Sequence, residues 1–309
     1  MASSTIYDDV FRTLLNDCPA LIIPVINELF GENYSGDELI EFKPNEHFVK
    51  QQDGNEDKRI TDTLFVIHSL VLKDYHLECQ SSNDGTLIIR IFEYDSQIAL
   101  DHGTIQDNVL HVKFPNSAVL FLRSTSNTPD FMTVCVEFPN GSFSYNIPVM
   151  KVQRYSIEEI FDKRLLFLIP FYIFSHEKNF DVYDNSEQKL NSLLDEYKTI
   201  AEKLDALVLN GSVDEYTKCT LHDMTGKVIE FIAKNHSTVR EGVKNIMVGK
   251  ILDYPAKDIL RQGISQGITE GRLSMLFELV TKKLLSLKDA SVMADLSEDE
   301  FSRMMKITN

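Results

Sequence analysis

The stretch that decides the fold is ITDTLFVIHSL (60–70) followed by YHLECQS (75–81), with a short connection at Val71–Asp74. Both runs are rich in β-branched and aromatic residues, which predicts two neighbouring strands. The next run, TLIIRIFEYDSQIAL (86–100), changes to a helical period, and Gly103 ends it. Two strands followed by a helix predict the centre of an α/β fold.

The segments on either side extend this prediction. A helix is expected over residues 6–30, broken or kinked at Pro19 and Pro24, and a polar loop over 43–58. Further strands are expected at 117–123 and, more weakly, near 131–138 and 142–147, where a PNGS turn suits a hairpin. The first 152 residues therefore predict a mixed β-sheet flanked by helices.

Beyond residue 155 the pattern is helical almost throughout. Ser156 and Glu159 have the spacing of a capping box, and charged amphipathic helices are expected at 187–209 and 214–235. We therefore predict three parts, with bounds 1–152, 153–260 and 261–309.

Composition limits the classes of function. Aspartate and glutamate outnumber lysine and arginine by 47 to 31, which gives a net charge of −16. Because phosphate binding is driven by positive charge, this balance excludes a protein that coats nucleic acid. Action on DNA would need a locally basic path or a bound cation. A hydrophobic content of 43% excludes overall disorder.

The cysteines and the N-terminus indicate the compartment. Four separated cysteines without a CxxC pair argue against a zinc site and a disulfide scaffold. The N-terminal residues lack the pattern of a signal peptide. The most apolar run, residues 165–174, is half the length of a membrane span and contains Pro170. We expect a soluble, cytoplasmic protein without a membrane segment.

The register of the two strands decides which acidic side chains face each other. In an antiparallel hairpin centred near Leu70, residues whose numbers sum to about 140 face each other, which pairs Asp62 with Glu78. Side chains alternate along a strand, so Gln80 lies on the same face as these two acids. A slip of one residue would separate them.

Two adjacent carboxylates repel unless a cation neutralises them, and Mg²⁺ suits such a site. The Gln80 amide could orient a water or a phosphate. The alternative is structural: Asp62 caps a strand and Glu78 is exposed on one sheet face. His76 would share the face of Glu78 and could border the site or simply form a hydrogen bond. No metal-binding spacing joins His68, His76 and His102.

The run RITDT…YHLECQS resembles the nuclease core of the PD-(D/E)XK superfamily, and more narrowly the bacterial recombination-promoting nuclease (Rpn) and transposase-like group. Asp62 matches the motif aspartate and Glu78 the motif glutamate, while Gln80 stands where most members of the superfamily keep lysine. The group's other features are matched by the acidic start of the first helix, the arginine and tyrosine after the catalytic strand, and glycines every four residues: Asp8, Phe11, Arg12, Arg90, Tyr94, Gly263, Gly267 and Gly271.

The resemblance implies a restriction-endonuclease-like core and Mg²⁺-dependent hydrolysis of DNA, linked to recombination, mobile elements or defence. Mn²⁺ is expected to substitute for Mg²⁺. Asp62, Glu78 and the backbone carbonyl of Cys79 would bind the metal, with Gln80 positioning water or phosphate. Asp8 is a candidate third carboxylate, although its charge could simply stabilise the helix start; Glu28 is an alternative.

Three arginines are candidates for phosphate contacts. Arg90 and Arg12 are the stronger ones, and an ordinary salt bridge is the better interpretation of Arg59. Tyr94 is expected to pack on the sheet.

The glycine spacing keeps one edge of a helix smooth, which favours a homodimer through the C-terminal helices; a flexible joint is the alternative. The rival function is an inactive protein that kept the nuclease fold for interaction, which the acidic charge and the missing lysine favour. A nuclease acting on RNA is a third possibility.

Overall fold

A computed structural model of the chain describes residues 6–43, 46–50, 56–60, 63–69, 71–81, 85–247, 273–277, 280–281, 285–294 and 296–308, of which 46–50, 56–60 and 306–308 are described by their backbone only. The chain divides into two compact units, Met1–Gly249 and Lys250–Asn309. The predicted change near residue 152 falls inside the first unit.

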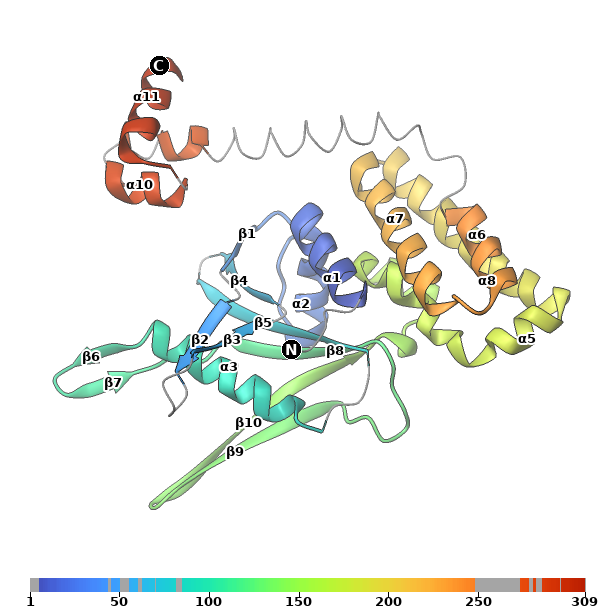
Figure 1. Ribbon diagram of the computed structural model, residues 1–309, viewed down its shortest axis with the longest axis horizontal. Helices are drawn as coiled ribbons and strands as arrows, with labels where there is room; N and C mark the ends of the chain where they lie inside the picture. The colour runs from blue at the N-terminus through green and yellow to red at the C-terminus, as the bar shows by residue number, and fades with distance from the viewer. Residues whose placement is uncertain are drawn as a thin grey trace. The chain divides into compact units, whose positions relative to one another are not determined.

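Six strands form the central sheet of the first unit, in the order β1-β4-β5-β8-β10-β9 (Figure 1). Strands β1, β4 and β5 are antiparallel neighbours, β8 runs parallel to both β5 and β10, and β9 is antiparallel to β10. The bounds are β1 Leu39–Phe42, β4 Thr63–His68, β5 Lys73–Gln80, β8 Asn116–Phe121, β9 Phe131–Phe138 and β10 Gly141–Lys151. The sheet is therefore mixed, as predicted.

The register of β4 and β5 agrees with the sequence arithmetic. Thr63 faces Leu77 and Phe65 faces Tyr75, so the numbers of paired residues sum to 140. The prediction is confirmed for the described pairs. Asp62, which would be next in this register, lies outside the described residues.

Helices cover both faces of the sheet. Helix α3 (Leu87–Asp101) connects β5 to β8 and lies on one face, while α1 (Ile6–Asp17) and α2 (Ile23–Phe30) lie on the other (Figure 1). The predicted stripe of α3 is buried, because Leu87, Ile91, Tyr94 and Ile98 face the sheet. The predicted interruption between α1 and α2 is the short helix η1, which begins at a proline and spans Pro19–Ile22.

Two small ribbons were not predicted. Strands β2 (Glu46–Lys50) and β3 (Glu56–Ile60) pair where a polar loop was expected, so that prediction was wrong for these residues. A two-stranded ribbon pairs backbone groups without needing an apolar face, and a search for buried faces misses it. Strands β6 (Thr104–Gln106) and β7 (Val109–His111) form a second ribbon.

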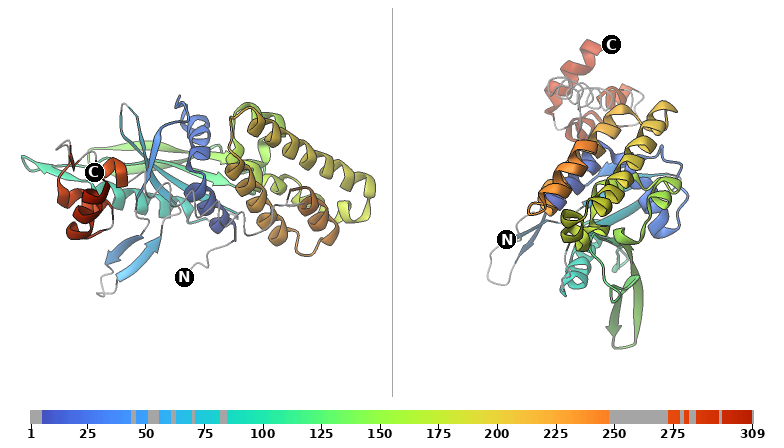
Figure 2. Two further views of the ribbon diagram at one scale, coloured as in Figure 1. Left: turned by 90° about the horizontal axis from the view of Figure 1, so that it is seen from above. Right: turned by 90° about the vertical axis from the view of Figure 1, so that its right-hand side faces the viewer.

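The helical region packs against one end of the sheet, within the same unit (Figure 2). The predicted capping box is confirmed: Ser156 accepts a hydrogen bond from the Glu159 backbone, and the Glu159 side chain accepts one from the Ser156 backbone. The elements are η2 Val152–Arg154, α4 Ile157–Asp162, η3 Leu166–Ser175, η4 Glu177–Asn179, α5 Phe180–Asn185, α6 Glu187–Leu209, α7 Glu215–Ile232 and α8 Ser237–Met247.

The second unit is small and helical where it is described. Residues 273–277 are helical, and α10 (Leu287–Met293) and α11 (Glu298–Thr308) follow. The rings of Phe277 and Phe301 meet edge to face with centroids 4.9 Å apart, at the centre of its apolar core. Short helices were predicted here. The glycines at 263, 267 and 271 lie outside the described residues, so the predicted dimer contact stays a prediction.

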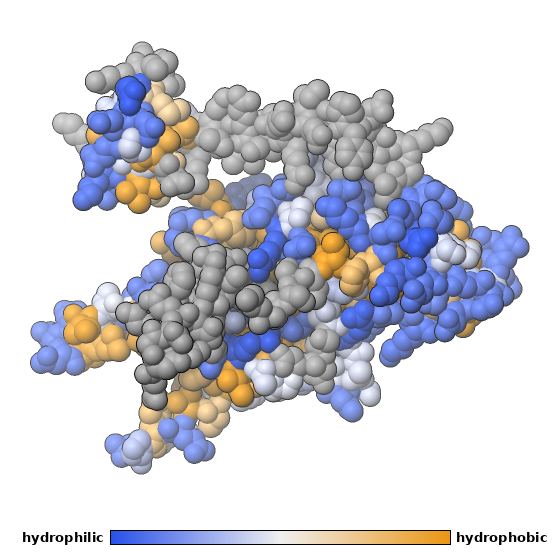
Figure 3. Space-filling model, viewed as in Figure 1, coloured by the Kyte–Doolittle hydropathy of each residue, from blue (hydrophilic) through white to orange (hydrophobic). Residues whose placement is uncertain are grey.

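The surface carries apolar side chains on the projecting hairpins β6–β7 and β9–β10 (Figure 3). Ile105, Leu110, Phe138 and Phe143 are all exposed there. Among the described residues, no single helix is both long enough and apolar enough to cross a membrane.

Candidate functional site

Four buried polar side chains form a row between helix α3 and the sheet. We call them the polar row: Ser117, Asp95, His76 and Glu78. They come from three elements, since Ser117 is on β8, Asp95 on α3, and His76 and Glu78 on β5. Their exposed fractions are 7%, 0%, 0% and 3% in that order. Buried polar groups of this kind require partners, because an unpaired charge in the interior is costly.

Each member of the polar row contacts the next. Ser117 Oγ donates to Asp95 Oδ1 at 2.7 Å, and the same oxygen lies 2.7 Å from His76 Nδ1. On the other side of the ring, His76 Nε2 lies 3.3 Å from Glu78 Oε1. The ring also packs edge-on against Tyr94, with centroids 6.0 Å apart. His76 is thus held between two carboxylates.

The two carboxylates determine the charge of His76. Burial alone lowers the pKa of this histidine, but hydrogen bonds and charges from Asp95 and Glu78 outweigh burial and raise the pKa to about 9. The imidazolium can donate from both ring nitrogens at once, which the neutral ring cannot do. His76 therefore carries a positive charge at neutral pH and neutralises part of the row.

The row has a closed end and an open end. At the closed end, Asp95 Oδ2 is buried and has no hydrogen-bond partner among the described residues. At the other end, Glu78 Oε2 accepts from Gln80 Nε2 at 3.3 Å and lies 3.8 Å from Arg90 Nη2. Gln80 and Arg90 are both partly exposed. Glu78 thus has one oxygen facing the interior and one facing accessible polar groups.

Several predicted residues are brought together here. Glu78 and Gln80 are in contact, as their shared face predicts, and the structure also places Arg90 of α3 at 3.8 Å from Glu78. His76 borders the site and is also hydrogen-bonded, so both interpretations of this residue hold. Tyr94 of α3 is buried and packs against His76 of the sheet, as expected. Glu78 is buried, so the alternative that it is exposed on the sheet surface is wrong.

The other predicted site residues do not belong to the polar row. Glu28 accepts from Lys163 Nζ at 2.6 Å and from Tyr155 Oη at 3.2 Å, away from the polar row. Asp8 lies in the first turn of α1. Arg12, also on α1, has a buried Nε without a hydrogen-bond partner among the described residues. Arg59 belongs to β3, and Asp62 is not described.

The structure adds two residues that sequence reasoning missed, Asp95 and Ser117. Asp95 interrupts the apolar stripe of α3, and a charged residue among buried positions is a usable signal. Ser117 begins an apolar strand and gives a weaker signal. Their partner His76 is 19 and 41 positions away from them in the sequence, so only the fold brings the row together.

The described side chains do not form a metal site by themselves. Within the described part of the chain, no group of three His, Cys, Asp or Glu residues is arranged to hold an ion. The polar row offers one carboxylate oxygen, Glu78 Oε2, of the kind that Mg²⁺ prefers. Cys79 pairs with Leu120 in the β5–β8 register, and its side chain is buried. A complete site would need the oxygens of Asp62.

Comparisons with known proteins provide no relative from which a function could be carried over. No family model, curated protein or solved structure matches the chain. Function must therefore be inferred from the polar row and from the sequence motifs around it.

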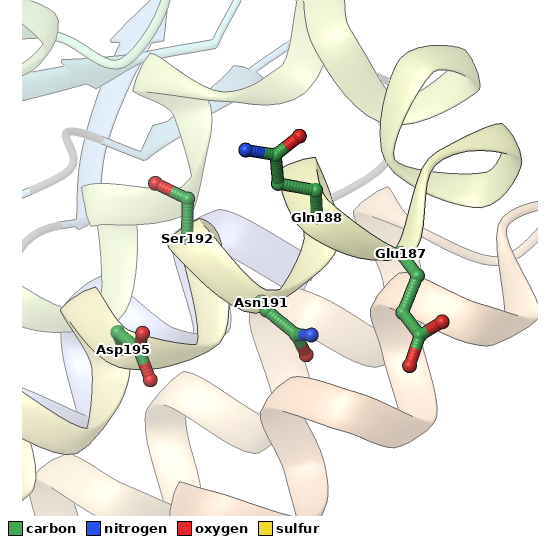
Figure 4. A pocket seen from close by; sticks show the side chains of 5 residues that line it. All are labelled: Glu187, Gln188, Asn191, Ser192 and Asp195. Atoms are coloured by element: carbon green, nitrogen blue, oxygen red, sulfur yellow. The ribbon is translucent and has the colours of Figure 1, made fainter.

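A hollow along α6 is the other feature that we considered. Its lining is polar and comes from one helix (Figure 4): Glu187, Gln188, Asn191, Ser192 and Asp195. All five side chains are exposed, and none is a buried group that needs a partner. This hollow lacks the features that make the polar row a candidate site.

Proposed function

We propose that the chain is a divalent-metal-dependent endonuclease that hydrolyses phosphodiester bonds in DNA, with Asp62 and Glu78 as metal ligands. The observation that carries the proposal is the carboxylate of Glu78. It is almost completely buried in a central strand, yet one of its oxygens faces an amide and a guanidinium that are partly exposed. Acidic side chains are seldom buried unless they are paired, and Glu78 combines a buried partner, His76, with an oxygen on the accessible side.

The register of the hairpin supports the second ligand. Continuing the described pairing of β4 and β5 by one residue would pair Asp62 with Glu78. Residues directly opposite each other in an antiparallel pair have Cβ atoms about 4.5–5.5 Å apart, which suits two carboxylates that share one ion. The mixed sheet with helices on both faces is also what the resemblance to PD-(D/E)XK nucleases implies.

The surrounding side chains can serve phosphodiester hydrolysis. A divalent cation held by the two acids would stabilise negative charge on the phosphate and activate a bound water. Gln80 would orient the water or a phosphate oxygen through its amide. Arg90 would bind phosphate oxygens, for which its planar guanidinium is suited. No lysine stands at position 80, so Arg90 would be the nearest permanent positive charge.

A second candidate function is supported by the same geometry. His76 and Arg90 already place positive charge beside both oxygens of Glu78, which reduces the need for a metal. Together with the net charge of −16, this favours an inactive protein that kept the fold for interaction.

The test compares cleavage and metal binding in the same proteins. The wild-type chain, Asp62→Asn and Glu78→Gln are incubated with supercoiled plasmid and Mg²⁺ or Mn²⁺, and Mn²⁺ affinity is measured by electron paramagnetic resonance. Each variant should lose at least about a thousandfold in cleavage rate, because a ligand that neutralises the transition state is removed. Mn²⁺ binding should be lost in parallel.

The matched control is Glu137→Gln, which removes an exposed acid from strand β9 and should cleave as the wild type does. A wild-type chain that binds Mn²⁺ but cleaves only RNA would move the substrate from DNA to RNA. A wild-type chain that neither binds Mn²⁺ nor cleaves any nucleic acid would leave the interaction function as the conclusion.

A further inference from the structure

The two edge strands of the central sheet differ in their protection. At one edge, β1 has four residues and carries Glu41, which forms an ion pair with Lys43 directly after the strand. Short, charged edges resist pairing with another chain. At the other edge, β9 has eight residues, FMTVCVEF, without proline or lysine, and it pairs with β10 without a bulge (Figure 1). Among the described residues, no strand pairs with the outer side of β9.

Strand β9 is held in shape within its own chain. Val134 is buried in the apolar cluster between α3 and the sheet, and Met132 and Val136 pack against the same cluster. On the other face, Thr133 Oγ1 donates to Asn146 Oδ1 of β10 at 2.8 Å. An edge that is already ordered loses little conformational freedom when another strand is added to it. The outer side of β9 is therefore suited to accept a strand.

We propose that β9 pairs with β9 of a second copy of the chain, antiparallel and about a two-fold axis perpendicular to the sheet. This axis puts the same face of both sheets on one side, so even-numbered residues lie opposite even-numbered ones. In the register whose numbers sum to 270, Phe138, which is 59% exposed, lies opposite Met132 of the second copy. Val134 lies opposite Val136. The apolar layer under α3 then continues from one copy into the other.

The distribution of charge favours a second copy as the occupant. With a net charge of −16, most surfaces of two copies repel each other. Strand β9 has a single charged residue, Glu137, and this register places it opposite Thr133 of the second copy instead of another acid. Cys135 lies on the two-fold axis, opposite itself. The register that sums to 268 would put Glu137 opposite Phe131 and leave Phe138 unpaired. The strand is therefore complementary to itself in the register that sums to 270.

Cys135 allows a direct test of this register, because its side chain is exposed in the single chain. Opposite residues of an antiparallel pair have Cα atoms about 4.5–5.5 Å apart, within the range of a disulfide. Copper phenanthroline, which takes two electrons and two protons from two thiols, should convert the full chain to a covalent dimer on a non-reducing gel. All proteins in this test carry Cys219→Ser, since Cys219 is the other cysteine that is not buried. Adding Cys135→Ser should abolish the covalent dimer.

The control for random collisions moves the thiol one strand inward. Ser144 is exposed on β10 and is paired with Cys135. In the proposed dimer the two copies of residue 144 are three strand spacings, or about 14 Å, apart. A disulfide does not form beyond about 7 Å between Cα atoms. The double variant Cys135→Ser with Ser144→Cys should therefore stay uncrosslinked.

Sedimentation velocity measures the same contact without a crosslink. Cys135→Lys places two lysines opposite each other on the axis and should raise the Kd of the dimer at least about tenfold. Ser144→Lys adds the same charge to the same face of the neighbouring strand and should leave the Kd unchanged. Because one strand pair is a small interface, the full chain is measured up to about 100 µM. Thermal melting checks that both variants are folded.

Each outcome decides the inference. A covalent dimer through Cys135, together with dimerisation that is weakened by Cys135→Lys and not by Ser144→Lys, would support it. A wild-type chain that stays monomeric over the whole range would overturn it, as would equal crosslinking through Ser144→Cys. An oligomer that Cys135→Lys leaves unchanged would also overturn it and would place self-association at another surface, such as the C-terminal helices. The inference does not depend on the proposed function, and none of these outcomes alters that function.

Discussion

His76 is buried and His176 is half-buried, each next to a carboxylate, yet their pKa values shift in opposite directions. His76 lies between Asp95 and Glu78 in the sheet. In the helical region, His176 has one carboxylate neighbour, with Nε2 3.0 Å from Glu196 Oε2, and its Nδ1 lies 2.9 Å from Tyr183 Oη. Burial lowers the pKa of His176 and outweighs the charge of Glu196.

The difference follows from the number of acceptors. A neutral imidazole can accept from the Tyr183 hydroxyl, while Nε2 lies near Glu196 but has no hydrogen-bond partner among the described residues, so nothing requires His176 to carry a charge. Two carboxylates require two donated protons, so His76 is charged. Glu196 has a second partner as well, because Tyr172 Oη donates to its Oε2 at 2.7 Å. In the helical cluster, the carboxylate of Glu196 lies against His176 and Tyr172. In the polar row, one oxygen of Glu78 faces side chains that are partly exposed.

The largest effect that distinguishes the two clusters is expected from removing the histidines. His76→Ala removes the positive charge between two buried carboxylates, Asp95 and Glu78, which should lower the free energy of unfolding by about 3–5 kcal/mol. His176→Ala removes a neutral ring and should lower it by about 1–3 kcal/mol. Urea denaturation at pH 7 measures both. Equal losses would contradict the assignment of charge.

The pH dependence of stability should differ in sign. His76 has a pKa of about 9 in the folded chain, above the ordinary histidine pKa of about 6.5. Its contribution is therefore fully present below about pH 6.5 and is lost as the pH rises through 9, by on the order of 3 kcal/mol. His176 has a lowered pKa in the folded chain, so it disfavours folding as the pH falls below 6.5.

Urea denaturation of the wild type and of His76→Asn between pH 6.5 and 9 measures this contribution. The wild type should lose stability over that range, and the variant should lose less. Parallel curves for the two proteins would show that His76 does not release its proton there.

The smallest effect is expected at Glu196. Glu196→Gln keeps an acceptor for Tyr172 but removes the charge of Glu196, which raises the pKa of His176. Stability at pH 7.5 should fall by about 1 kcal/mol, the typical value of one hydrogen bond. The variant should also lose more stability than the wild type on acidification to pH 5.5. Thermal melting at the two pH values checks this, and an acid response unchanged from the wild type would contradict it.

The hairpin and its register could be predicted from the sequence, because two apolar runs around a short connection permit few pairings. The shared face of Glu78 and Gln80 followed from that register, whereas Arg90 was singled out by the resemblance to the nuclease family. Asp95 and Ser117 could not be paired with His76, because their contacts depend on how α3 crosses the sheet. The side chain of Asp62, on which the metal site depends most, is not among the described residues.

The ribbons β2–β3 and β6–β7 escaped prediction for a different reason. All six residues of β6 and β7 are exposed, and burial is what periodicity detects. In β6–β7 the turn residues Asp107 and Asn108 both have positive φ values, 49° and 61°. This is the conformation of a tight hairpin turn that aspartate and asparagine tolerate, so the Asp-Asn pair was the available signal.

Helix η3, Leu166–Ser175, has one more consequence. Apart from its last residue, every side chain of this segment is buried. It packs against α7 and η1, and Phe167 meets Phe11 of α1 with ring centroids 5.3 Å apart. A fragment that ended near residue 152 would present the uncovered surface of α1 to water and would be prone to aggregate. A stable protein is therefore expected to need the sheet and the helices after it in one polypeptide.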